Sequence, residues 1–193
     1  MRRLKRVIDI TASLILLATL APLMLGIALA ILCESSGGAF FRQRRAGFQG
    51  REFEIIKFRS MRSGLHGQGH ATGIRDPRIT RLGGLLRRTS LDELPQLFNV
   101  LTGDMSLVGP RPLLLPSIRA DEKSRLEMRP GITSLAAVSG RQSLTWDQRM
   151  DLDRWYVEHW SVWLDIRILA RTIPVALSQA NVYDPDGEMK ARI

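Results

Sequence analysis

Residues 10–33 read ITASLILLATLAPLMLGIALAILC, an apolar run of 24 residues without a charged side chain. A membrane-embedded helix needs about 20 consecutive apolar residues, so the run is long enough for one. Pro22 lies near its centre and removes a backbone hydrogen-bond donor, so we expect a helix here to bend. The limbs on its two sides, residues 10–21 and 23–33, are each about 16 to 18 Å long, roughly half the thickness of a bilayer core.

Basic residues flank both ends of this run. Those before it are Arg2, Arg3, Lys5 and Arg6, and those after it are Arg42, Arg44, Arg45 and Arg51. Because basic residues favour the cytoplasmic face, a spanning helix would place one cluster on the wrong side. The sequence therefore favours a re-entrant helix that bends at Pro22 and returns to the face it entered, with a spanning helix as the alternative. A signal peptide is disfavoured by the length of the run. Asp9 is expected at the interface, paired with Arg6.

Length and composition exclude several classes of protein. The 193 residues are enough for one domain, and a hydrophobic content of 45% excludes a disordered chain and a protein with many membrane spans. A single cysteine, Cys33, excludes a disulfide framework and a cysteine-based zinc site. The net charge of +9 is carried by residues 1–112, which indicates anionic partners such as lipid headgroups, nucleic acid or phosphorylated small molecules.

The rest of the chain predicts an α+β domain, mostly helical with a small β-hairpin. The hairpin is expected over residues 39–58, around Gly47 and Gly50, and helices at about 91–102, 119–128 and 146–178, the last broken near Pro174. We divide the chain into a basic N-terminus with its membrane helix (1–38), a cytoplasmic domain (39–180) and a polar tail (181–193).

Two groups of residues leave alternatives open. All four tryptophans lie between Trp146 and Trp163, where they suit either amphipathic helices at a membrane interface or the core of the domain. His66 and His70 are spaced like metal ligands, but their glycine-rich loop offers no supporting cysteine or carboxylate cluster, which disfavours a metal site.

Asp92 and Glu93 form an adjacent acidic pair in an arginine-rich part of the chain. The structural interpretation is a capping box, in which Ser90 begins a helix and Glu93 caps it in return. The chemical interpretation is a site for a divalent cation and a phosphate, because carboxylates among arginines suit both. Adjacent helical positions diverge by about 100°, so the two carboxylates can serve different roles.

Four motifs in chain order resemble the bacterial sugar transferase family, the monotopic phosphoglycosyl transferases. They are KFRSM at 57–61, TSLDELPQL at 89–97, NVLTGDMSLVGPRP at 99–112 and RPGIT at 129–133. The resemblance runs from the basic N-terminus to about Thr172, and the chain has the size of the minimal catalytic member. It implies transfer of a sugar 1-phosphate from a UDP-sugar to polyprenol (undecaprenyl) phosphate, with release of UMP. It also implies a re-entrant helix among membrane lipids, on the cytoplasmic face of the bacterial inner membrane.

The resemblance also implies roles for individual residues. Asp92 would attack the sugar-bearing phosphorus to give a covalent phosphosugar intermediate, and Glu93 would assist with Mg²⁺, which both carboxylates would hold. The implied phosphate-binding positions are Lys57, Arg59, Arg88 and Arg111, and Arg141 is a candidate for the nucleotide or phosphate. Ordinary surface ion pairing is the alternative for each cation, most seriously for Arg59 and Arg88.

Three positions depart from the family's pattern, namely Ala21, Ala137 and Ser139. Ala21 removes a hydroxyl before Pro22 that could satisfy a freed carbonyl, and the other two remove amides expected in nucleotide or sugar recognition. A membrane-anchored protein that binds anionic lipid or nucleic acid without turnover is the main alternative, although no nucleic-acid module is recognisable and we expect no nucleic-acid partner. A phosphatase acting on lipid phosphates is a third reading, and a homodimer stays open.

Overall fold

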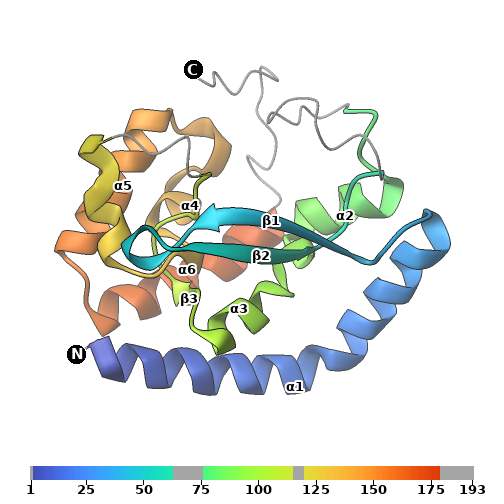
Figure 1. The fold of residues 1–193 in the computed structure, drawn as a ribbon, viewed down its shortest axis with the longest axis horizontal. Helices are drawn as coiled ribbons and strands as arrows, with labels where there is room; N and C mark the ends of the chain where they lie inside the picture. Colours follow the sequence, from blue (N-terminus) through green and yellow to red (C-terminus); the bar gives the residue numbers. More distant parts are fainter. Residues whose placement is uncertain (1, 63–75, 115–119, 179–193) are drawn as a thin grey trace.

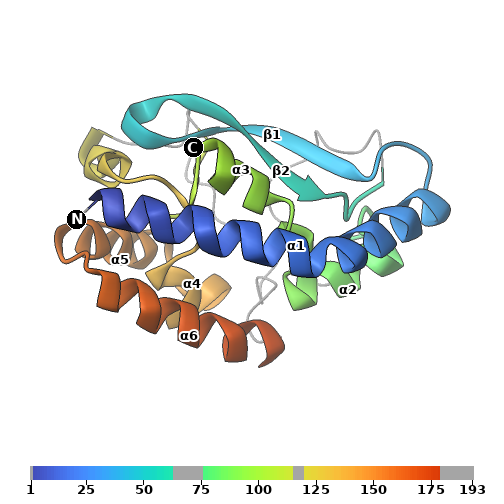
Figure 2. The same cartoon turned by 90° about the horizontal axis from the view of Figure 1, so that it is seen from below.

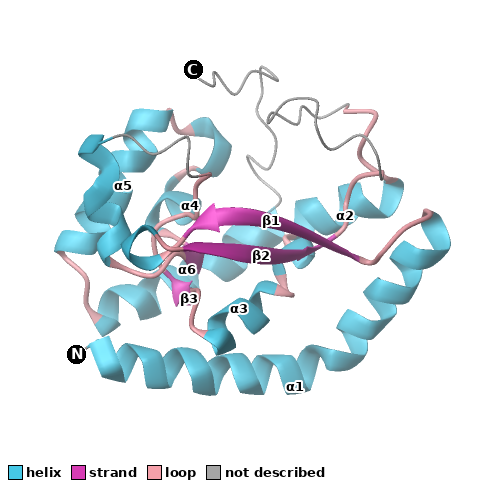
Figure 3. Cartoon of the chain, viewed as in Figure 1, coloured by secondary structure: helices cyan, strands magenta, loops and turns pink. Residues whose placement is uncertain are grey.

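The computed structural model describes residues 2–62, 76–114 and 120–178. The elements in chain order are α1 (Arg2–Glu34), β1 (Phe40–Ala46), η1 (Phe48–Gly50), β2 (Glu52–Phe58), α2 (Arg81–Thr89), η2 (Leu91–Glu93), α3 (Gln96–Thr102), β3 (Ser106–Val108), η4 (Ala120–Glu127), β4 (Gly131–Thr133), α4 (Leu135–Ser139), η5 (Arg141–Ser143), α5 (Trp146–Glu158) and α6 (Val162–Ser178). The described residues are mostly helical, with the β1–β2 hairpin lying against one side of the helices, which confirms the predicted fold class (Figure 3). His66, His70 and the tail at 181–193 lie outside the described residues.

Helix α1 is continuous, carries Pro22 inside it, and bends between its two limbs (Figure 1). Within the described ranges it alone is long and apolar enough to cross a membrane. Its exposed large apolar side chains are Leu4, Val7, Ile8, Leu14, Ile15, Leu16, Leu23, Leu25, Leu29 and Leu32. Seen from below, α1 lies across the domain between α3 and α6 (Figure 2). A continuous apolar face of this kind marks a surface for a membrane or a partner.

The opposite face of α1 belongs to the core of the domain. Met24, Ile27 and Ile31 are buried against Phe58 of β2 and Leu86 of α2. The membrane-type helix is therefore packed onto the domain along its second limb.

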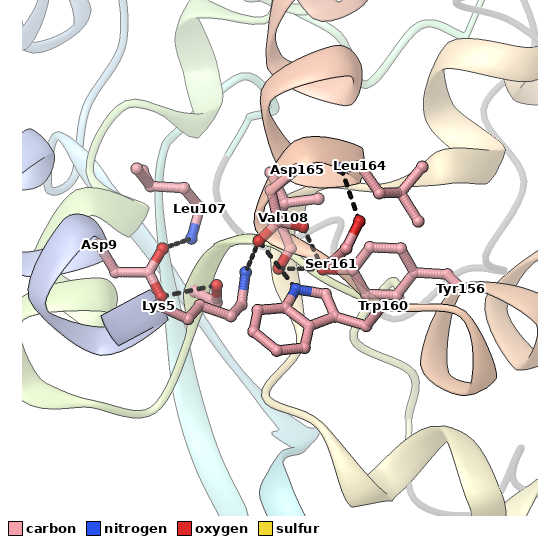
Figure 4. A network of polar contacts seen from close by, with 10 residues as sticks. Lys5, Asp9, Leu107, Val108, Tyr156, Trp160, Ser161, Leu164 and Asp165 are labelled. Atoms are coloured by element: carbon pink, nitrogen blue, oxygen red, sulfur yellow. Dashed lines mark hydrogen bonds and ion pairs between the residues drawn. The ribbon is translucent and has the colours of Figure 1, made fainter. Parts of the chain in front are cut away.

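A buried carboxylate, that of Asp165, joins the first limb of α1 to the first turn of α6 (Figure 4). Lys5 Nζ lies 2.5 Å from Asp165 Oδ2, and Asp165 also accepts hydrogen bonds from the Tyr156 hydroxyl (2.6 Å) and Trp160 Nε1 (3.0 Å). Lys5 is 8% and Asp165 8% exposed, so the pair is largely removed from water. Buried charges persist only when they are paired, and here the pair fixes α1 against α6.

Asp9 and Arg6 reach the domain separately. The Asp9 carboxylate accepts hydrogen bonds from the Ser106 hydroxyl (2.8 Å) and the Leu107 N–H (3.2 Å), and only 4% of Asp9 is exposed. The Arg6 guanidinium donates to backbone carbonyls in the last turn of α3, including that of Leu101 at 2.9 Å. The predicted Arg6–Asp9 pair is therefore wrong, because the ends of α3 and β3 offer each charge a better-aligned partner.

The hairpin prediction is confirmed. β1 and β2 pair antiparallel from Phe40 opposite Phe58 to Ala46 opposite Glu52. Residues directly opposite one another share a face of the sheet, and Phe53 and Ile55 are buried in the main core. The face of the sheet that carries Phe53 and Ile55 therefore packs against the helices.

A second, parallel pair of strands was not predicted. Ser106 lies opposite Gly131 and Val108 opposite Thr133, joining two motifs far apart in sequence. A Cβ on Gly131 would lie 2.1 Å from the Gly109 nitrogen, so only glycine permits this approach. Three-residue strands carry too little periodicity to be recognised in a sequence.

The helices after residue 90 differ in detail from their predictions. Residues 91–102 hold the 3-10 turn η2 followed by α3, and the helix predicted at about 119–128 is, in its described part, the 3-10 helix η4 (Ala120–Glu127). The stretch 146–178 is two helices, α5 and α6, and Pro174 lies inside α6 rather than breaking it. Trp163 is 59% and Trp155 45% exposed, whereas Trp160 is partly buried. The aromatic residues thus supply both the core and the surface.

Candidate active site

Asp92 and Glu93 lie in η2, between α2 and α3. Ser90, just before them, has a left-handed backbone (φ 58°) and its side chain makes no cap. The Ser90 hydroxyl instead accepts a hydrogen bond from Arg141 Nη2 at 2.9 Å, and the Glu93 carboxylate binds Lys57. The capping-box interpretation is therefore wrong, and both groups make tertiary contacts.

Glu93 forms an ion pair with Lys57 of β2, with 2.6 Å between Oε1 and Nζ. The two side chains are 25% and 22% exposed. Burial alone would raise the pKa of Glu93, but the charges of Lys57, Arg111 and Arg141 outweigh it and hold that pKa below its usual value. Glu93 is therefore ionised at neutral pH.

Asp92 behaves in the opposite way. It is 9% exposed, and burial, helped by the negative charge of Glu93, raises its pKa to about 6 against the opposing charges of Lys57 and Arg87. Neighbouring carboxylates whose pKa values are driven apart can take different chemical roles. A buried carboxylate with a raised pKa beside cations is typical of a reactive group.

Further arginines surround the two carboxylates. Arg141 has a left-handed backbone (φ 54°), and its guanidinium is held by Ser90. Burial and the charge of Arg111 lower the pKa of Arg45 to about 10, against the opposing charge of Glu93. The cations whose charges act on this pair or on one another are Arg45, Lys57, Arg87, Arg111 and Arg141. Five cations around two carboxylates leave an excess of positive charge, which favours a bound polyanion such as a diphosphate.

The structure brings together most of the predicted site. Lys57, Arg111 and Arg141 act on Glu93 through their charges. Arg59 lies elsewhere: it is 4% exposed, and its guanidinium donates to the Ser35 and Ser36 carbonyls, where it holds the end of α1. Arg88 lies on the exposed side of α2. Neither joins the group around Glu93, so a role in binding phosphate stays a prediction for both.

Two cations were missed, Arg45 and Arg87. Arg45 shares a face of the hairpin with Lys57, because Arg45 lies opposite Phe53 and Lys57 opposite Phe41, both on the same side of the sheet. The alternation of side chains between the two faces of the predicted hairpin would therefore have identified Arg45 as a neighbour of the site. Arg87 and Arg88 are adjacent helical residues, and only the packing of α2 decides that Arg87, whose Nε donates to the Ser60 hydroxyl at 2.9 Å, is the one whose charge acts on Asp92.

Replacement of Asp92 by Asn is expected to stabilise the folded protein. The carboxyl loses its proton near pH 3.8 when unfolded and near 6 when folded, so the folded state is penalised above pH 6 and the penalty vanishes below about pH 4. We expect a gain on the order of 1–3 kcal/mol at pH 7.5. Thermal melts at pH 7.5 and pH 4 measure it, and a lower melting temperature at pH 7.5 would contradict the cost assigned to this charge.

The donor set is compatible with Mg²⁺. Within residues 2–62, 76–114 and 120–178 no group of three or more metal-ligating side chains is found. Mg²⁺ commonly binds through one or two carboxylates while substrate phosphates and water complete its shell, and Asp92 with Glu93 fits that pattern. The magnesium prediction therefore requires a phosphorylated substrate at the same site.

Comparison with known proteins supports an enzyme site. The family model described as bacterial sugar transferase matches residues 1–179. The chain is 46% identical to a UDP-glucose:undecaprenyl-phosphate glucose-1-phosphate transferase of Caulobacter vibrioides, over 93% of this chain and 72% of that protein. It is 41% identical to an uncharacterized sugar transferase of Bacillus subtilis, with 88% and 85% covered. An undecaprenyl-phosphate galactose phosphotransferase of Salmonella typhimurium is 40% identical, and the match covers 94% of this chain and 42% of that longer protein. The family-model match over residues 1–179 and the identity to these relatives show that this chain belongs to the bacterial sugar transferase family.

Proposed function

We propose that this protein transfers a sugar 1-phosphate from a UDP-sugar to undecaprenyl phosphate and releases UMP. The observation that carries the proposal is the buried Asp92 carboxylate, whose pKa is raised to about 6 beside an ionised Glu93 and an excess of cations. Two similar proteins carry names that describe sugar-phosphate transfer to this lipid. Transfer to a lipid phosphate would begin the synthesis of a polysaccharide or another glycoconjugate.

The proposed reaction has two displacements at phosphorus. An Asp92 carboxylate oxygen attacks the sugar-bearing phosphorus, the bond from that phosphorus to the bridging oxygen breaks, and UMP leaves with the electron pair. An oxygen of undecaprenyl phosphate then attacks the aspartyl phosphosugar, and the Asp92 carboxylate leaves. A covalent intermediate lets a soluble donor and a membrane-bound acceptor react in turn at one site.

The cations around Asp92 have a defined task in this scheme. A carboxylate approaching a diphosphate is repelled, so positive charge must already be in place where negative charge develops. Lys57 Nζ lies 2.6 Å from Glu93 Oε1, and the charges of Arg111 and Arg141 also act on Glu93, so positive charge is concentrated beside the acidic pair. Mg²⁺, held by Asp92 and Glu93 together with substrate phosphate, would neutralise part of the diphosphate charge. We therefore expect a chelator to abolish transfer and added Mg²⁺ to restore it.

The contacts of α1 support a re-entrant helix. Lys5 and Asp9, near its start, bind Asp165 and the β3 backbone, while Met24 to Ile31, near its end, pack on the same domain. Both ends of α1 must therefore lie on the side of the membrane that holds the domain. We place that side at the cytoplasmic face of the bacterial inner membrane, with the exposed apolar face of α1 among the lipids.

Cysteine labelling tests this topology. In a Cys33→Ser background, Arg3→Cys and Ser36→Cys each place one thiol near an end of α1, at positions that are exposed in the fold. We expect a membrane-impermeant maleimide to label neither thiol in intact spheroplasts and both after permeabilisation. Labelling of one thiol from outside would establish a spanning helix instead.

The reaction itself is tested with the purified protein in lipid nanodiscs. Undecaprenyl phosphate, Mg²⁺ and UDP-glucose or UDP-galactose are supplied, and lipid-linked sugar and UMP are measured. Transfer gives both products in equal amounts. Free sugar phosphate without lipid-linked sugar would identify a hydrolase, and unchanged donor alongside lipid binding would identify a binding protein.

A further inference from the structure

We propose that the buried Arg125–Asp153 ion pair positions Arg111, by holding both backbone polar groups of that residue. The inference rests on the proposed function, because it gives Arg111 its value in binding or stabilising phosphate. Neither Arg125 nor Asp153 belongs to the motifs that identify the family. Both are positioning residues that act through Arg111.

Arg125 and Asp153 together bind the backbone of a single residue, Arg111, and we call this pair of contacts the clamp. Asp153 Oδ2 accepts the Arg111 N–H at 3.3 Å, and Arg125 Nη2 donates to the Arg111 carbonyl oxygen at 2.6 Å. Arg125 Nη2 also donates to Asp153 Oδ2, which closes the ring of contacts. With both its N–H and its C=O bound, Arg111 has a fixed Cα position and a fixed direction of its Cα–Cβ bond.

The pair is removed from water, whereas the side chain of Arg111 is not. Arg125 is 3% and Asp153 1% exposed, and Arg111 is exposed. The pair comes from η4 and α5, so two elements distant from the acidic pair hold the residue whose charge acts on Glu93, Arg45 and Arg141. A long exposed side chain such as that of Arg111 reaches the same position reproducibly only when its backbone is held rigidly.

The sequence around Arg111 strengthens this interpretation. Arg111 stands between Pro110 and Pro112, which restrict its backbone and carry no N–H of their own. Asp153 and Arg125 therefore bind the one N–H and the carbonyl that this three-residue segment presents to them. A buried ion pair seldom stabilises a fold more than apolar residues of similar size, so stability alone is a weak reason for it.

The test removes the clamp without leaving a buried charge unpaired. We use the full chain in nanodiscs with the double variant Arg125→Met/Asp153→Leu, alone and combined with Arg111→Ala. We expect the pair variant to melt near the wild-type temperature and to lose about 10- to 100-fold in kcat/KM for the UDP-sugar. In the Arg111→Ala background the same substitutions should cost less than about 2-fold, because the residue they act through is already gone.

A matched control is Lys5→Met/Asp165→Leu, which removes another buried ion pair, one that binds α1 and Tyr156 rather than the Arg111 backbone. The control variant should lower activity by the same factor in the wild-type background and in the Arg111→Ala background, because it does not act through Arg111. An equal loss from the Arg125–Asp153 pair variant in both backgrounds would overturn the proposal and leave the pair a general support of the fold.

Hydrogen–deuterium exchange gives a readout that needs no turnover. Since Pro110 and Pro112 lack an N–H and the N-terminal residue of a peptide retains no amide deuterium, Arg111 carries the one reporting amide of a peptide over residues 109–112. We expect this amide to exchange at least 10-fold faster in the pair variant and at the wild-type rate in the control. Unchanged exchange would overturn the clamp even if activity fell. Wild type without transferase activity would count against the proposed function instead, while exchange would still decide whether the pair holds Arg111.

Discussion

Asp92→Asn is expected to lower the rate of sugar-phosphate transfer by about 10⁴-fold or more and to abolish the covalent adduct. The amide has almost the volume of the carboxylate but cannot supply the attacking oxygen anion. Burial of Asp92 makes the substitution favourable for folding, so a more stable but inactive protein is the combined expectation.

Intact-protein mass spectrometry measures this directly. Wild type mixed with Mg²⁺ and a UDP-sugar, without lipid acceptor, should gain the mass of one phosphosugar, which undecaprenyl phosphate then removes. Asp92→Asn should gain nothing. The matched control is Asp151→Asn, the same chemical change at an exposed residue of α5 that pairs with Arg154, and it should form the adduct normally. An adduct on Asp92→Asn, or rapid transfer by wild type without any adduct, would remove Asp92 as the nucleophile.

The pH dependence of adduct formation follows from the same carboxylate. Asp92 must be ionised to attack, and its pKa is about 6, so the rate should fall as the pH drops below about 6. This fall at low pH, the acid limb of the pH–rate profile, lies above the pH range in which an ordinary aspartate titrates, because burial disfavours the charged form.

Lys57→Met is expected to lower the rate of adduct formation by about 10²- to 10³-fold and to move the acid limb to higher pH. Lys57 is the largest favourable charge on both carboxylates, so its loss raises the pKa of Asp92 and of Glu93. Glu93, 2.6 Å from Lys57 in the wild type, would lose its ion-pair partner.

Two further variants separate the charge from other effects. Lys57→Arg keeps the charge and should keep the acid limb near its wild-type position. Arg42→Met removes a cation from the opposite face of the hairpin, where the side chain is 65% exposed, and should change neither rate nor pH profile. A slow Lys57→Met enzyme with an unmoved acid limb would contradict electrostatic coupling between Lys57 and Asp92.

Much of this architecture followed from local patterns. An apolar run of 24 residues interrupted at Pro22 predicts a bent helix, and α1 bends. Alternating residues around Gly47 and Gly50 predict a hairpin, and β1 and β2 pair as expected. The acidic pair was also found from the sequence, because two carboxylates among arginines carry a chemical signal that does not depend on the fold.

Other features could be decided only in three dimensions. Ser90 and Glu93 have the spacing of a capping box, but a left-handed Ser90 turns them toward Arg141 and Lys57. Arg59 stands in a recognised motif, yet its guanidinium donates to the carbonyls of Ser35 and Ser36, which directly follow α1.

The sequence by itself thus determined the long apolar helix α1, the hairpin and the acidic pair, since each depends on periodicity or on neighbouring residues. Only the tertiary structure decided which cations surround that pair, which faces of α1 are covered, and how β3 and β4 join. These outcomes depend on contacts between residues 14 to 160 positions apart, such as Arg125 with Arg111 or Lys5 with Asp165. Packing and the pairing of buried charges choose there among partners that local sequence leaves equivalent.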